Sequence, residues 1–210
     1  MQVAEHLRHS IIRGDLPPGS QVTETDLAQR YGVSRGPLRE AMSQLIGEGL
    51  IVSIPYTGTR VMSLSRTDVR EIFSLRTCLE TLAFEQAWER RDAVFFDEME
   101  TRHRALLASL RKSDHYESSL AEVRLHSLVY EASGHKLLLE TWQRIASRLQ
   151  LYLAVHQRAH GRTGPKRDAH ERYVKLAQGK RLDLMIAEVE HHMRRGVEQL
   201  ERYLETAKNA

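Results

Sequence analysis

The sequence predicts a mainly α-helical protein with an N-terminal winged helix-turn-helix and a C-terminal antiparallel bundle of six helices. Two observations lead to this fold class. Four of the five prolines fall within residues 1–65, which alternate short apolar-periodic stretches with turn residues. From about residue 68 onward, long charged stretches carry apolar residues at helical spacing. We therefore expect a DNA-binding domain at 1–64, a linker at 65–67 and a helical domain at 68–210.

The N-terminal elements follow from their capping and turn residues. Gly14 suits the end of a helix, Thr23 and Ser34 suit helix starts, and Pro37 suits a first turn. The tight Tyr31–Ser34 turn between two short helices is typical of a helix-turn-helix. β-Branched residues around a Pro-Tyr-Thr-Gly turn favour a hairpin wing. The expected elements are helices at Val3–Arg13, Glu24–Tyr31 and Arg35–Glu48, and strands at Leu50–Ile54 and Thr59–Leu64.

The second part predicts six amphipathic helices joined by short turns, an arrangement that forms an antiparallel bundle. One break interrupts the pattern at Gly161–Pro165. The expected helices are Asp68–Asp92, Ala93–Lys112, His115–Ser133, Lys136–Gln157, Lys166–Gln178 and Arg181–Thr206.

Composition excludes several classes of protein. The 210 residues include one cysteine, Cys78, so neither an internal disulfide framework nor a cysteine-based zinc finger is possible. No apolar run approaches the roughly 20 residues of a membrane span, and the N-terminus lacks a signal-peptide pattern. We expect a cytoplasmic protein with no membrane partner, with Cys78 filling space in the core.

The formal net charge of +3 is a weak indicator of nucleic-acid binding. Residues 1–65 contain six arginines, no lysine and six acidic residues, so the predicted DNA-binding part is neutral by count. Any interaction with DNA must therefore depend on where the arginines lie.

The helix that starts at Ser34 has the features of a recognition helix. Arg35 and Arg39 are four residues apart and share one face, opposite the apolar stripe. Arginine matches guanine O6 and N7, the Ser34 hydroxyl can reach phosphate, and Gly36 lies in the same first turn. The alternative for Arg39 is an exposed pair with a neighbouring acid.

Small residues at the expected wing tip permit close approach to the minor groove of DNA. We expect Thr57 and Gly58 to lie at this tip and Arg60 to contact phosphate. Arg60 could equally be a solvated strand residue.

The segment Gly14–Val61 resembles the DNA-binding domain of GntR-family bacterial transcription regulators. The resemblance rests on the G-x-x-x-PG, E-x-x-LA, GVSR-x-P-x-REA and L-x-x-EGL motifs and on the wing glycine. The rest of the chain resembles the FCD effector domain of the FadR-type branch, in its shorter, VanR-like six-helix form. The two resemblances together cover essentially the whole chain.

The FCD resemblance implies a metal site. Glu122 and His126 share one helix face, while His170 and His192 lie on later helices. Spacing alone is weak support, because 11 histidines produce chance pairs. The resemblance implies that these four residues hold a divalent ion, with Zn²⁺ favoured and Ni²⁺ or Mn²⁺ as alternatives. Glu122 replaces the family's aspartate and is the least secure ligand.

The same resemblance implies a small-molecule site beside the metal. Arg76 matches an arginine that the family places in the first effector-domain helix, and Arg148 is a second candidate for the same cavity. A guanidinium suits a carboxylate ligand, so we expect an organic-acid effector. An ordinary salt bridge is the alternative for both residues, and it is the better expectation for Arg148.

The resulting expectation is a homodimeric transcription regulator that binds a palindromic double-stranded operator, with repression favoured and activation as the alternative. An effector would change its affinity for the operator. The alternative is a metal-dependent hydrolase built on the helical bundle. Against it, the sequence has no G-x-S-x-G, H-E-x-x-H, P-loop or G-x-G-x-x-G motif.

Overall fold

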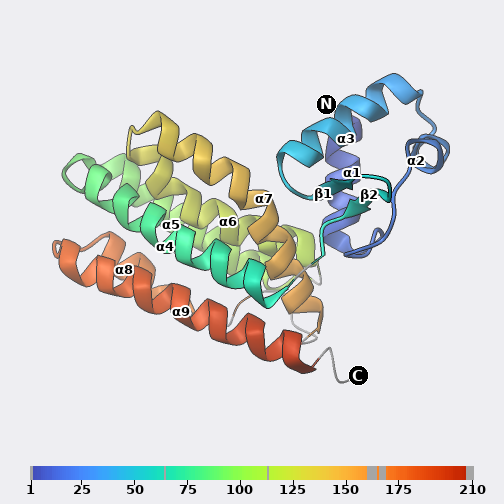
Figure 1. Ribbon diagram of the computed structural model, residues 1–210. Coiled ribbons are helices and arrows are strands. Elements are labelled where there is room, and N and C mark those ends of the chain that lie inside the picture. Colours follow the sequence, from blue (N-terminus) through green and yellow to red (C-terminus); the bar gives the residue numbers. More distant parts are fainter. Residues whose placement is uncertain (1, 64, 113, 160–164, 166–168, 207–210) are drawn as a thin grey trace.

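The computed structural model describes residues 2–63, 65–112, 114–159, 165 and 169–206. It contains a small N-terminal domain beside an elongated helical bundle (Figure 1). The small domain is a winged helix-turn-helix, as predicted. Its elements are α1 (Gln2–Arg13), α2 (Glu24–Tyr31), α3 (Arg35–Gly47), β1 (Ile51–Ile54) and β2 (Gly58–Val61).

Local signals explain the helix-turn-helix. The Thr23 hydroxyl accepts from the backbone N–H of Asp26 and caps α2, and Gly32 ends that helix in the left-handed conformation. Leu38 and Leu45 place the buried face of α3 in the core of the domain. The opposite face of α3 is left exposed.

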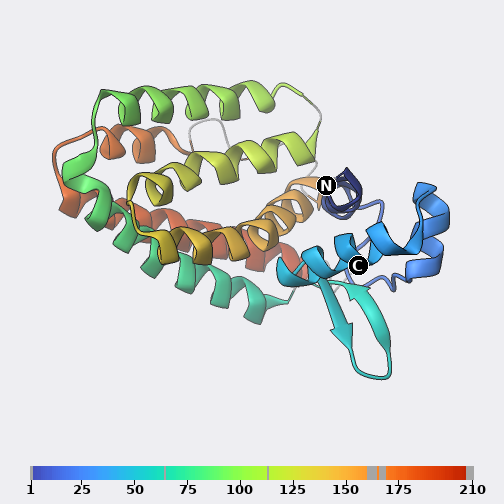
Figure 2. The same cartoon turned by 90° about the horizontal axis from the view of Figure 1, so that it is seen from above.

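The wing is an antiparallel hairpin in which Ile51 pairs with Val61 and Ile54 with Gly58. It projects away from the helical bundle (Figure 2). At its tip the backbone N–H of Thr57 donates to the carbonyl of Ile54 at 3.1 Å. Tyr56 has a φ of 64°, in the left-handed region where glycine is usual.

The helical domain contains six α-helices among its described residues, together with the single-turn 3₁₀ helix η1 (Trp88–Arg90). In the bundle, α4 packs against α9, and α6 packs against both α5 and α7 (Figure 1). The α-helices are α4 (Arg66–Ala87), α5 (Ala93–Ser109), α6 (His115–Ala132), α7 (Lys136–Ala159), α8 (Glu171–Ala177) and α9 (Leu182–Thr206).

Three details differ from the sequence-based expectations. Ser65 and Asp68 form a capping box, so α4 begins at Arg66 and most of the expected linker is its first turn. The first expected helix ends early, at Ala87, and continues as η1. The placement of Cys78 in the core is wrong, because this side chain is exposed on α4. Leu64 and residues 166–168, at the ends of an expected strand and helix, lie outside the described residues.

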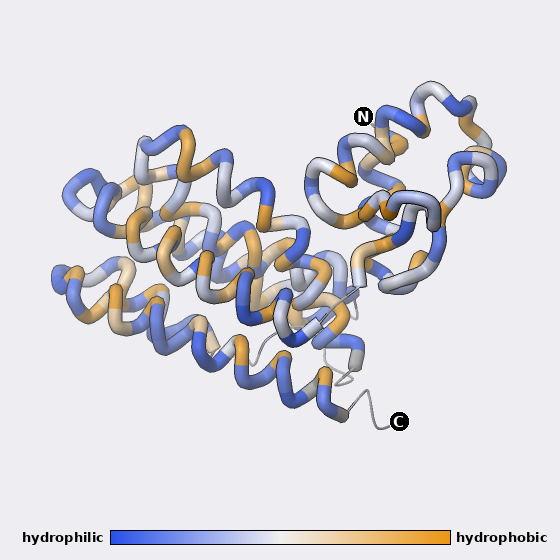
Figure 3. The backbone as a smooth tube through the Cα atoms, viewed as in Figure 1, coloured by the Kyte–Doolittle hydropathy of each residue, from blue (hydrophilic) through white to orange (hydrophobic). Residues whose placement is uncertain are grey.

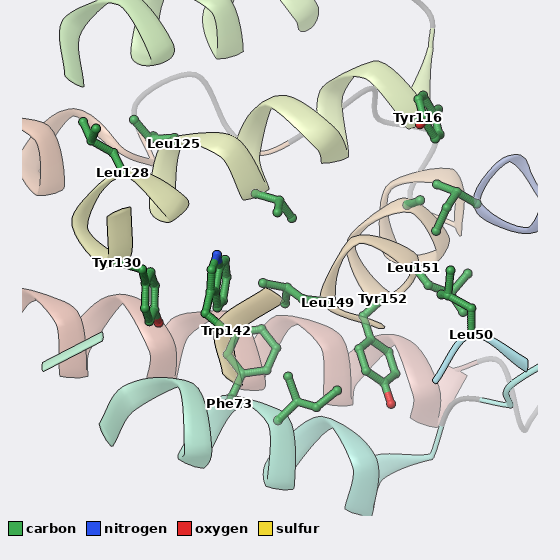
Figure 4. Packing of buried hydrophobic residues seen from close by; sticks show 14 of the residues in the cluster. Leu50, Phe73, Tyr116, Leu125, Leu128, Tyr130, Trp142, Leu149, Leu151 and Tyr152 are labelled. Carbon is green, nitrogen blue, oxygen red and sulfur yellow. The ribbon is translucent and has the colours of Figure 1, made fainter. Parts of the chain in front are cut away.

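Apolar residues alternate with hydrophilic ones along each helix (Figure 3), as expected for amphipathic helices that bury one side. In the core, the Tyr130 and Trp142 rings stack with centroids 4.4 Å apart, and Phe73 extends from α4 toward them (Figure 4). The Trp142 indole N–H donates to the Ser127 hydroxyl at 2.8 Å, which satisfies its polar atom. No described helix is both long and apolar enough to cross a membrane.

Polar contacts connect the two domains where α1 lies against α6 and α7. The Tyr116 hydroxyl of α6 donates to Glu5 of α1 at 2.7 Å. The Ser147 hydroxyl of α7 donates at 3.2 Å to Glu48, the residue that caps the C-terminus of α3. Hydrogen bonds therefore contribute to holding the DNA-binding domain against the bundle.

Candidate functional site

Three histidines from three different helices converge inside the bundle. His126 lies on α6, His170 is the N-cap residue of α8, and His192 lies on α9. One ring nitrogen from each histidine lies within 4.8 Å of the others, and the ring centroids are 4.7–5.2 Å apart. The neighbouring His191 is exposed, so His192 is the member of this adjacent pair that joins the cluster.

Burial keeps these imidazoles neutral. Desolvation lowers the pKa of His126, His170 and His192 well below the ordinary value, and the nearby positive charge of Arg76 lowers each pKa further. A neutral imidazole is the form that ligates a metal ion. Burial therefore favours the ligand-competent, neutral form of all three histidines.

Glu80 of α4 orients His126. This carboxylate is fully buried and lies 3.0 Å from His126 Nδ1. It also accepts hydrogen bonds from the Tyr173 hydroxyl at 2.7 Å and from Arg76 Nε at 3.2 Å. An acceptor at Nδ1 places the proton there and leaves the Nε2 lone pair of His126 available, which is the usual outer-sphere arrangement for a metal-binding histidine.

The donor set fits a divalent ion. Among the described residues, His126 Nε2 and His170 Nε2 are buried and have no hydrogen-bond partner. A buried polar atom without a partner is costly, and coordination of a cation would remove that cost. The carboxylate of Glu122 lies 3.6 Å from His170 Nε2, next to the three histidines. It does not belong to the group whose atoms all lie within 4.8 Å of one another.

Arg76 reaches the same place from α4. It is buried, forms an ion pair with Glu80, and its guanidinium lies 5.6 Å from the Trp142 ring centroid. Its Nη2 has no hydrogen-bond partner within the described part of the chain. Arg76, Glu122, His170 and His192 line a cavity of about 60 Å³. This cavity has room for a small polar group beside the histidines.

Arg148 does not join this cluster. Its Nε lies 3.4 Å from Met62 Sδ, and it lines a hollow with Gly49 and Val52 of the DNA-binding domain. It is absent from the lining of the cavity beside the histidines. The position of Arg148 on α7 directs it to the domain junction, so the effector-binding role expected for it has no support from the geometry.

The exposed N-terminal face of α3 presents the residues expected to read DNA. Ser34, Arg35, Gly36 and Arg39 are all exposed. Although Ser34 is at the N-cap position, its hydroxyl makes no capping hydrogen bond. Arg39 donates through Nε and Nη2 to the Glu24 carboxylate of α2, both at 3.1 Å.

The wing tip exposes Thr57 and Gly58, two of the three residues expected there, together with Tyr56. The third, Arg60, donates to the Gly19 carbonyl and ties the wing to the loop before α2. Tyr56 is 108% exposed, more than any other large apolar or aromatic side chain described.

This combination defines a DNA-binding domain of the winged helix-turn-helix class joined to a helical domain with a buried polar site. Family models agree: residues 1–61 match the bacterial regulatory proteins of the gntR family, and residues 71–205 match the FCD domain. The chain belongs to the GntR family, in its FadR-type branch. It is therefore a transcription regulator and not an enzyme.

Relatives support the same family. The gluconate operon transcriptional repressor of Bacillus licheniformis is 27% identical over 89% of this chain and 78% of its own length. The transcriptional repressor GlaR of Escherichia coli is 32% identical over 66% of this chain and 65% of its own. Among solved structures, E. coli McbR/YncC has a TM-score of 0.79 at 21% identity and covers 96% of both chains, so it shows the same fold.

Two residues described above were not anticipated from the sequence, one beside the histidines and one at the wing tip. Glu80 lies on the buried face of α4 together with Arg76, among buried Phe73, Ala83 and Phe84. An isolated carboxylate on a buried stripe, four residues after Arg76, is a detectable signal for a buried polar network. Tyr56 follows Pro55 at a position where a turn favours glycine, which signals an unusual backbone.

Proposed function

We propose that the protein is a ligand-responsive repressor that reads a palindromic operator as a homodimer. The observation that carries this proposal is the exposed N-terminal face of α3, where Arg35 and Arg39 stand on a rigid helix. Ser34 and the start of α3 would contact phosphate, and the two arginines would contact bases in the major groove. Gly36 permits close approach of the helix, and Thr57 and Gly58 would approach the minor groove.

The dimer follows from the geometry of DNA recognition. One α3 reads only a few base pairs, so specificity for an operator needs two copies about one helical turn apart. A two-fold symmetric protein dimer matches a palindromic duplex. Operator binding places the protein in the cytoplasm, with the chromosome.

In the helical domain, His126, His170 and His192 would hold one divalent ion, and Zn²⁺ is the best match for three imidazoles. Ni²⁺ and Mn²⁺ are the alternatives. The ion would supply a positive centre for an anionic ligand. Glu122 is placed to complete the set of ligands or to hold His170 in position.

The effector would be a small organic acid. Buried Arg76 offers Nη2 to a carboxylate in the adjoining cavity, and the metal would bind the same anion from the other side. Effector binding would act on DNA through α4 and α6, with a coupling free energy of about 1–3 kcal/mol.

The DNA-reading role can be tested by fluorescence anisotropy with a duplex selected from a random pool. Arg35→Ala and Arg39→Ala should each weaken binding by about 1–3 kcal/mol and relax preference at one base pair per half-site. Arg104→Ala, an exposed change on α5, is the matched control and should have no effect. Unchanged affinity and base preference in both α3 variants would refute the proposed reading face.

The metal can be tested by elemental analysis of protein purified without chelator. We expect roughly one divalent ion per chain, because the three histidines form one cluster. His170→Ala should lose it, whereas His191→Ala, a change of the exposed neighbouring histidine, should retain it. Metal-free wild-type protein that also ignores added Zn²⁺ would refute the site.

A further inference from the structure

A second, larger cavity lies between the two domains. It has a volume of about 560 Å³ and is lined by α1 and the end of α3 on one side and by α6 and α7 on the other. The histidine cluster does not line it. A volume of this size accommodates a small metabolite, whereas the cavity beside the histidines has about 60 Å³.

Two arginines without acidic partners face this cavity. Arg124 of α6 and Arg144 of α7 both line it, and neither guanidinium forms an ion pair with any described residue. Hydrogen bonds from Trp142 to Ser127 and from Ser118 to Gln157 fix the antiparallel register of α6 and α7 around them. Two positive charges on one wall favour an anionic ligand.

The acidic residues that line the cavity pair with other cations, so they do not neutralise Arg124 and Arg144. Glu5 and Glu48 share Arg8, which donates to Glu48 at 2.6 and 2.9 Å and also pairs with Glu5. The third acid, Glu140, lies 3.9 Å from Lys136. The acidic residues of the lining thus interact with Arg8 and Lys136, and the guanidinium groups of Arg124 and Arg144 can bind a ligand.

An independent observation comes from Gln150. This side chain is 4% exposed and lines the same cavity, and its Nε2 has no hydrogen-bond partner among the described residues. A buried amide donor without an acceptor is uncommon in a folded protein. A ligand oxygen in the cavity would satisfy it.

From these observations we infer that the interdomain cleft binds a small hydroxycarboxylate. Its carboxylate lies between Arg124 and Arg144, and its hydroxyls meet the donors and acceptors of Glu140, Gln143, Ser147 and Gln150. Leu120, Val123 and Ala146 form the apolar part of the lining, against which the carbon chain packs. This site is separate from the metal-associated site and does not depend on it.

The position of the cleft gives the ligand a direct route to DNA binding, a step that rests on the proposed operator-reading role. Ser147 lines the cleft and donates to Glu48, and Glu48 caps the C-terminus of α3. A ligand that accepts the Ser147 hydrogen bond would replace the contact between Ser147 and Glu48, which holds the end of α3 against the bundle. The cleft therefore couples to the recognition helix without passing through the histidines.

The test uses the full chain and isothermal titration calorimetry with D-gluconate, a six-carbon hydroxy acid. Arg124→Ala and Arg144→Ala should each weaken binding about tenfold or more, as expected for loss of a charged hydrogen bond. Gln150→Leu, which retains the buried volume, should also weaken it. The surface variant Arg104→Ala should bind as wild type, and D-glucitol, which lacks the carboxylate, should not bind measurably.

His170→Ala separates this inference from the metal-associated effector site. We expect gluconate to bind this variant as it binds wild type. Absence of saturable binding to wild type, equal binding by both arginine variants, or equal binding of D-glucitol would overturn the inference. Loss of binding in His170→Ala with both arginine variants unaffected would place the ligand at the histidines instead. Gluconate should change the DNA affinity of wild type but not of Arg144→Ala; binding without any such change would overturn the coupling.

Discussion

The guanidinium of Arg39 is held along one edge only. Glu24 accepts from Nε and Nη2, which are the side-on donors of the fork. The end-on pair of donors, on Nη1 and Nη2, is left for another bidentate partner such as guanine O6 and N7. An ion pair within the protein and a base contact are therefore compatible for the same residue.

The first prediction concerns Glu24→Gln. Removing a negative charge next to DNA should strengthen non-specific binding, because phosphate repulsion falls. Specific binding should gain less or weaken, because Arg39 loses its charged support and must be ordered on binding. The ratio of specific to non-specific affinity, measured by anisotropy on two duplexes, should fall. An unchanged ratio would show that Glu24 does not position Arg39.

Tyr56 occupies a left-handed backbone conformation that costs a non-glycine residue about 1–2 kcal/mol. Its exposed side chain has no packing that offsets this cost within the described domain. Tyr56→Gly should therefore raise the free energy of unfolding by up to about 1 kcal/mol. Glycine also makes the unfolded chain more flexible, and this effect reduces the gain. Chemical denaturation of the full chain measures this change. Tyr56→Phe keeps the strained backbone and should match wild type; equal stability of all three proteins would contradict the strain.

Glu80 would act on the proposed metal site through His126. Glu80→Gln keeps the shape of the side chain but weakens the hydrogen bond that sets the His126 tautomer. Metal affinity should fall about 10- to 100-fold, as is usual when an outer-sphere partner is lost. Competition with a chromogenic chelator measures this. Glu188→Gln, a change of another buried acid, which pairs with Arg172, is the control and should retain wild-type affinity.

At the scale of elements, the residue that ends α3 is Glu48, whose carboxylate accepts hydrogen bonds from three other side chains. Glu48 accepts from Arg8 of α1, Gln44 of α3 and Ser147 of α7. Burial raises the pKa of Glu48, but the hydrogen bonds and charge of Arg8 lower it more, so the net pKa is below the usual value. The stabilisation that Glu48 contributes is therefore present above its unfolded pKa and is lost as the pH falls through its folded pKa.

This linkage gives a prediction for Glu48→Gln. Above about pH 5 the variant should be less stable than wild type by about 1–2 kcal/mol, because Arg8 loses a charged acceptor. The difference should shrink as the pH falls below the ordinary glutamate range and through the lowered folded-state pKa of Glu48, where the wild-type carboxyl takes up a proton. Urea unfolding at several pH values measures both proteins. A difference that does not depend on pH would show that the charge of Glu48 does not stabilise the fold.

At the scale of the whole molecule, the three histidines come from α6, α8 and α9, so a metal ion bound to them would link these three helices. A metal bound only by the folded state stabilises it by mass action, by about 2.7 kcal/mol at a free concentration 100 times Kd. Removal of the metal with EDTA should therefore lower the thermal unfolding temperature by several degrees, and added Zn²⁺ should restore it. His170→Ala should show neither response. A wild-type protein indifferent to EDTA and Zn²⁺ would contradict this.

Much of the fold was predictable because its signals are local. Thr23, Gly32 and the apolar stripe of α3 specify the helix-turn-helix over short stretches, where capping and periodicity are decided by near neighbours. His192 lies three residues after the buried Val189, so helix periodicity directs it inward and leaves His191 outward. The end of α4 at Ala87 was not predictable, since the helix and the 3₁₀ turn after it have similar composition.

The sequence by itself determined the two domains and the positions of the recognition helix and wing, because each depends on residues within a few turns. Only the tertiary structure decided that Glu80 joins the histidines, that Arg76 does and Arg148 does not, and that Arg124 and Arg144 face one cleft. The physical reason is that these groups come from helices far apart in the chain. Their meeting is set by how the helices pack, which no local spacing encodes.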